Sequence, residues 1–88
     1  MPDRALQEAL DRLRAEVREI ESNDRAAEQR LQALINEVEA RLAHPEDADL
    51  HRNLVSAIRA GIEHFEETHP RATAILNEIT MALSNMGI

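Results

Sequence analysis

Apolar side chains recur along the first half of the chain at alternating steps of three and four residues. This spacing keeps one stripe of an α-helix turned toward a partner helix. The residues on this seam are Leu6, Leu10, Leu13, Val17, Ile20, Ala27, Leu31, Leu34 and Val38. Asp3 is a suitable N-cap and most intervening residues are strong helix formers, so the pattern predicts helical structure over about 3–43.

The seam is interrupted by Ser22, Asn23 and Asp24, three residues that favour caps and turns over helix interiors. Asp24 also falls on a seam position, where a large apolar residue is expected. We therefore predict two helical segments in this half of the chain, 3–21 and 24–43, with a break between them.

The second half of the chain has a similar apolar periodicity and begins after a loop at Pro45. Pro45 ends the preceding helix, and Asp47 is a suitable N-cap for the next one. Pro70 is favourable as the first residue of a helix but costs about 3 kcal/mol or more in a helix interior, so a second break is predicted at 69–70. The predicted segments are 48–68 and 70–86, within a single helical domain over 1–88.

Both breaks fall at the same height when the two halves are folded against each other at Pro45. In such an antiparallel hairpin, positions whose numbers add to about 92 lie level, so Asp24 faces Thr68. The preferred arrangement is all-α: an antiparallel helical hairpin, bent at breaks near 22–24 and 69–70, that forms a helical bundle by self-association. The alternative is a chain doubled over at both breaks into a compact monomeric four-helix bundle.

The size of the chain also favours self-association. A chain of 88 residues has a small core, and the absence of cysteine excludes disulfides as reinforcement. We expect a homo-oligomer, either a dimer or a tetramer, and a further protein partner that the sequence does not identify. The predicted contact residues are Leu13, Val17, Ile20, Ile75, Ile79 and Leu83.

The charge balance is strongly acidic and excludes several classes of partner. The chain has 17 acidic residues against 10 basic ones, giving a net charge of −7. This deficit of basic residues argues against binding to nucleic-acid phosphates or to an anionic membrane surface. Arginine residues interleaved with the carboxylates also weaken the idea of an acidic mimic of nucleic acid. The sequence shows neither a signal-peptide pattern nor a membrane-spanning apolar run, so we expect a cytoplasmic protein.

One cluster of side chains has spacing that is typical of metal ligands. Glu63, Glu66 and His69 lie three residues apart, and the last two form the Glu-x-x-His pattern of di-iron helical bundles. Such spacing arises easily in a chain rich in glutamate, and His69 sits at the predicted break. We therefore expect no metal and no cofactor. A metal-binding bundle with these residues at a dimer interface is the alternative function.

The sequence contains no recognisable catalytic motif. None of its hydroxyl residues lies in a nucleophile elbow or a glycine-rich loop, and it lacks the Tyr and Trp that often line ligand pockets. We expect no catalytic residues and no enzyme activity. The preferred function is a structural or protein-interaction module that acts through helix–helix contacts.

Some residue strings are more specific than the apolar seam. They are Leu6-x-x-x-Leu10-x-x-Leu13, Phe65-Glu66-x-x-His69-Pro70-Arg71 and Ala82-Leu83-Ser84-Asn85-Met86-Gly87-Ile88. With these strings the chain resembles, over nearly its whole length, a bacterial family of short proteins described only as a domain of unknown function. The resemblance implies a small, helical, self-contained protein. It implies no activity and no site residues.

Overall fold

Four α-helices make up the fold of this protein, for which a computed structural model describes residues 2–20 and 24–85. They are α1 (Pro2–Glu19), α2 (Arg25–Ala43), α3 (Ala48–Phe65) and α4 (Pro70–Asn85). No strand occurs in the described ranges, so the all-α class is confirmed. The predicted helix ends at 21 and 86 lie outside the described residues.

The starts of three helices follow from the capping residues in the sequence. The Asp24 carboxylate accepts a hydrogen bond from the Ala27 N–H at 3.3 Å and caps α2. Asp47 caps α3 in the same way, through the Leu50 N–H at 3.0 Å. Pro70 is the first residue of α4, where a backbone N–H has no helical partner and is not needed.

Helix α3 ends at Phe65, three residues before the predicted end. The Phe65 carbonyl accepts hydrogen bonds from the N–H groups of both Thr68 and His69, at 3.2 and 2.8 Å. These bonds close a turn that reverses the chain ahead of Pro70. The break is therefore a full reversal between two helices, because a bent continuous helix would keep 66–68 helical.

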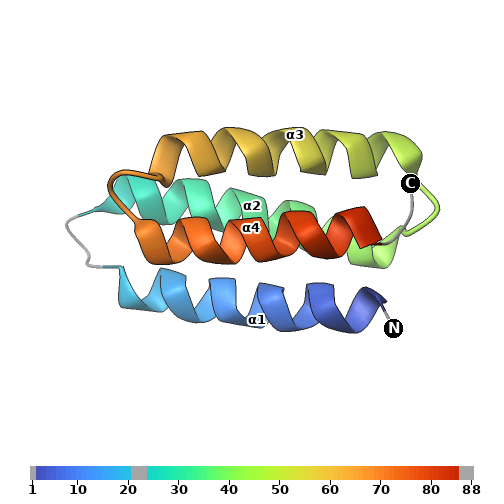
Figure 1. The fold of residues 1–88 in the computed structure, drawn as a ribbon, viewed down its shortest axis with the longest axis horizontal. Helices are drawn as coiled ribbons and strands as arrows, with labels where there is room; N and C mark the ends of the chain where they lie inside the picture. The colour runs from blue at the N-terminus through green and yellow to red at the C-terminus, as the bar shows by residue number, and fades with distance from the viewer. Residues whose placement is uncertain (1, 21–23, 86–88) are drawn as a thin grey trace.

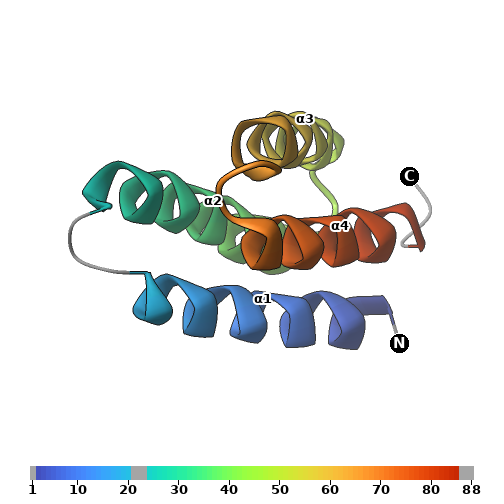
Figure 2. The same ribbon diagram turned by 60° about the vertical axis from the view of Figure 1, so that its left-hand side comes forward.

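Each helix contacts two neighbours in a closed ring of four, in the order α1, α2, α3, α4. Successive helices run antiparallel, and α4 returns to lie beside α1 (Figures 1 and 2). The described molecule measures 38 × 20 × 18 Å. A bundle with breaks at the predicted places is thus confirmed. Of the two predicted arrangements, the chain adopts the doubled-over one and not the long bent hairpin.

The core lies along the axis of this ring and contains most of the predicted seam. The buried seam residues of the first half are Leu6, Leu10, Leu13, Ala27, Leu31, Leu34 and Val38. From the second half the core receives Leu54, Ile58, Phe65, Ala72, Leu76, Ile79, Ala82 and Leu83. A burial pattern of this kind supplies the main free energy of folding for a small bundle. None of the described helices is long and apolar enough to cross a membrane.

Gly61 marks the closest approach of α3 to its neighbours. A Cβ atom at this position would lie 3.0 Å from Leu34 Cδ1 of α2 and 3.3 Å from Leu76 Cδ1 of α4. Both distances are tighter than ordinary van der Waals contact. The missing side chain therefore lets α3 pack closely against two helices at once.

Candidate functional site

The face formed by α1 and α4 carries an exposed apolar side chain. Met81 is 66% exposed, and among the described residues it is the large apolar side chain that lies mostly in solvent. It borders a hollow between the two helices that includes Ala5, Arg12 and Glu78. The exposed methionine thus stands beside a groove and not on an isolated convex surface.

A second hollow continues the same groove toward the other end of the bundle. It includes Ala15 and Glu16 of α1, together with Ala74 and Ile75 of α4. Arg12 lines both hollows and pairs with Glu78 across the groove at 3.0 Å. The α1/α4 face therefore has small apolar residues toward each end and an ion pair between them.

A polar pair is buried between α2 and α3. Arg41 and His51 are only 3% and 5% exposed. The Arg41 Nε–H donates a hydrogen bond to His51 Nδ1 at 2.9 Å. Burial, and next the positive charge of Arg41, lower the pKa of His51 from its ordinary value of 6.5. The ring is therefore neutral at pH 7, and because Nδ1 accepts, its proton lies on Nε2.

The sequence contained a signal for this pair that the apolar pattern obscured. Arg41 lies three residues after Val38 and so continues the seam of α2, while His51 lies three residues before Leu54 on the buried side of α3. The two residue numbers also add to 92, so the two residues lie level in an antiparallel hairpin that turns at Pro45. Long polar side chains are rarely buried without a partner, so two of them at one height were a sign of a buried contact.

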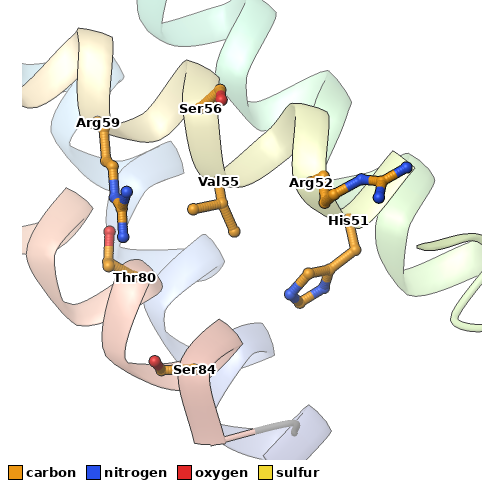
Figure 3. A pocket seen from close by; sticks show the side chains of 7 residues that line it. All are labelled: His51, Arg52, Val55, Ser56, Arg59, Thr80 and Ser84. Carbon is orange, nitrogen blue, oxygen red and sulfur yellow. The ribbon is translucent and has the colours of Figure 1, made fainter. Parts of the chain in front are cut away.

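A groove of about 370 Å³ lies between α3 and α4 and begins at His51 (Figure 3). Val55 lies along it, and Arg59 and Thr80 lie toward its other end. Ser84 of α4 lies opposite the His51 ring. Sequence analysis did not single out this set, because its members come from two helices and match no motif.

The three metal candidates do not assemble within one chain. His69 Nε2 lies 2.9 Å from Asp24 Oδ2, and its Nδ1 lies 2.9 Å from the Thr68 hydroxyl. Glu63 and Glu66 are exposed on the surface. The described residues include no group of three or more His, Cys, Asp or Glu side chains that could hold a metal. A site shared between two copies of the chain stays a prediction.

The six predicted contact residues divide into two groups. Leu13, Ile79 and Leu83 are fully buried in the core of the single chain. Their expected role assumed a long hairpin with half-covered faces, whereas doubling over covers these positions with helices of the same chain. The other three, Val17, Ile20 and Ile75, are half-buried. Of these, Ile75 lies in the α1/α4 groove.

Comparison with known proteins identifies the family of the chain. No curated protein sequence and no solved structure matches the chain significantly. A family model described as a domain of unknown function, DUF4404, matches residues 6–88. This match covers all four helices except the start of α1. The chain therefore belongs to the DUF4404 family of domains of unknown function.

Proposed function

We propose that the protein is a small helical interaction module whose α1/α4 face binds the same face of a second copy. The observation that carries this proposal is the position of Met81, exposed at the edge of a groove lined partly by small residues. Methionine adapts well to irregular apolar surfaces and is common at contact faces. Binding would remove this side chain from water.

The two ends of the groove complement each other. When two copies meet about a two-fold axis near Glu78, their α4 helices run antiparallel across the interface. Met81 lies three residues after Glu78, and Ile75 lies three residues before it. Met81 of each copy therefore faces the hollow around Ile75 and Ala74 of the other. On both sides of the axis, an exposed methionine meets a hollow that includes Ala74 and Ile75.

The charges near the proposed axis favour a second copy over an unrelated partner. Arg12 and Glu78 pair across the groove within one chain. Two-fold symmetry brings the same two charges from the other copy to the same height, so each arginine has two carboxylates within reach. A surface with both signs of charge at its centre is complementary to itself.

Absolute mass in solution, measured by light scattering after gel filtration, tests this proposal. We expect the wild-type chain to form a dimer and Met81→Glu to convert it to a monomer with unchanged helical content. Ala33→Glu on the exposed face of α2 is the matched control and should leave the dimer intact. A wild-type monomer at millimolar concentration, or a dimer that survives Met81→Glu, would contradict the proposal.

A further inference from the structure

The groove between α3 and α4 has a size suited to a small molecule. Its volume of about 370 Å³ lies in the lower part of the range for ligand pockets. His51 and Arg59 lie eight residues apart on α3, a rise of about 12 Å along the helix. Val55 provides an apolar surface between them (Figure 3). A ligand in the groove would thus contact a polar group at each end and an apolar side chain between.

The lining of this groove is free of acidic side chains in a chain that has 17 of them. Three other hollows on the described part of the chain each include carboxylates, for example Glu16, Asp11 and Glu78. An anion entering the α3/α4 groove therefore meets arginine and hydroxyl groups without a carboxylate to repel it.

Arg59 supplies a positive charge that the protein does not neutralise locally. It makes no ion pair with any residue in the described ranges, and it extends along the groove toward Thr80 (Figure 3). Arg52 differs, because it pairs with Asp49 and its guanidinium points away from the groove. Of the two arginines at the groove, Arg59 is thus the one placed to bind a ligand.

His51 supplies a donor at the other end. His51 is 5% exposed, and its ring reaches toward α4 at the end of the groove (Figure 3). Nδ1 accepts from Arg41, and the protonated Nε2 has no hydrogen-bond partner among the described residues. The charged guanidinium behind the ring polarises it and makes Nε2–H a stronger donor.

The hydroxyl groups on α4 differ in what they can offer. Thr80 donates its hydroxyl proton to the Leu76 carbonyl at 3.1 Å, so it is not free to donate to a ligand. Ser84 makes no such bond with the described residues and lines the same groove as His51 (Figure 3). Donors are therefore available from Ser84 and His51 at one end and from Arg59 at the other.

We infer that the α3/α4 groove binds a small organic anion. Arg59 holds its carboxylate or phosphate group, and His51 Nε2–H with Ser84 holds an oxygen acceptor at its other end. A guanidinium binds either type of oxyanion through charge-assisted hydrogen bonds. The site is separate from the α1/α4 face and does not depend on self-association.

The test follows the resonances of the isotope-labelled chain of residues 1–88 by NMR during separate titrations with inorganic phosphate and succinate. Ionic strength is held constant so that the electrostatic screening of the protein's charges does not change. We expect saturable shifts at Arg59 with at least one anion, and at His51 and Ser84 as well when the anion reaches the other end of the groove. Saturation by phosphate alone indicates a phosphate ligand, and saturation by succinate alone indicates a carboxylate ligand. Absence of saturation with both overturns the inference.

Two matched variants distinguish specific binding in the groove from non-specific electrostatic attraction of the anion to the protein. Arg59→Gln should raise the dissociation constant about tenfold, equivalent to about 1.4 kcal/mol. Arg52→Gln removes the same charge from the same helix and should leave the constant nearly unchanged. Equal weakening by both variants would overturn the inference. Ser84→Ala, an exposed substitution, should weaken binding less than Arg59→Gln does.

Discussion

The His69 ring contacts the carboxylate of Asp24, with Nε2 lying 2.9 Å from Oδ2. The other oxygen of the same carboxylate caps α2 through the Ala27 N–H. The Asp24 side chain thus caps α2 and also contacts His69, the residue that precedes α4.

Removing this carboxylate should therefore lower the free energy of unfolding by more than the loss of an ordinary helix cap does. We expect Asp24→Ala to lower the free energy of unfolding by about 1–2 kcal/mol, with the cap alone contributing about 1. Asp24→Asn keeps an oxygen that can cap α2 and should cost less. Urea unfolding followed by circular dichroism measures both. Equal losses for the two variants would show that the cap contributes little.

The buried His51 should make stability depend on pH. Its pKa is lowered in the folded state, so the unfolded chain binds a proton first as the pH falls. The contribution of His51 is fully present above its ordinary pKa of 6.5 and is lost below it, until the folded-state pKa is reached. The slope from this one group is at most about 1.4 kcal/mol per pH unit. Urea unfolding at successive pH values measures it.

Replacing His51 by a residue that does not titrate tests whether this group causes the slope below pH 6.5. His51→Gln should reduce that slope, although it also lowers stability because Arg41 loses its acceptor. An unchanged slope in His51→Gln would assign the effect to other groups.

Gly61→Ala places a methyl group against Leu34 and Leu76. We expect a net loss of stability of about 1 kcal/mol, because overpacking costs about 1–3 kcal/mol while the higher helix propensity of alanine returns up to about 1. Leu34→Ala alone should cost about 2–5 kcal/mol through the cavity it leaves. In the double variant the new methyl group has room, so the combined loss should be smaller than the sum of the single losses. An additive result would mean that the two groups do not meet.

Ile79 and Met81 should respond very differently to a charge. Ile79 is fully buried, so Ile79→Asp should unfold the chain instead of only separating copies. Met81→Glu changes an exposed position and should keep the helical content. Circular dichroism and light scattering on the same samples distinguish the two results. A folded monomer from Ile79→Asp would favour an intermolecular contact at this residue.

Salt should strengthen dimerisation through the α1/α4 face. Each copy carries a net charge of −7, and the two hollows of the groove together are lined by four glutamates and two arginines. Raising ionic strength shortens the Debye length from about 30 Å at 0.01 M to about 10 Å at 0.1 M and screens this repulsion. We expect the dissociation constant to fall several-fold over this range in sedimentation equilibrium. A rise would indicate that the ion pairs between copies dominate.

Much of this fold was predictable, because local chemistry determines where each helix begins and which residues of neighbouring helices lie level. Asp24, Asp47 and Pro70 begin helices where their capping or backbone properties require it. The rule that level residues have numbers adding to about 92 predicts the pairing of Arg41 with His51, and it places Asp24 within one position of His69.

The choice between an extended and a doubled-over chain was harder, because both place α1 against α4 and α2 against α3. The two arrangements differ in the width of the apolar stripe that each helix must bury against its neighbours. Ala9 and Ile35 lie beside the seam and are buried, which widens the stripe enough to face two neighbours. The α3/α4 groove was not predictable in this way, since its shape depends on how two separate helices pack.

The closed ring of helices also has a consequence for how the chain folds. The pairs α1–α2, α2–α3 and α3–α4 are each neighbours in sequence, so their contacts form across short separations. The contact of α1 with α4 is the most extensive in the ring, yet it joins the two most distant helices. Closing the α1/α4 contact costs the most loop entropy, so we expect it to form last and to set the folding rate.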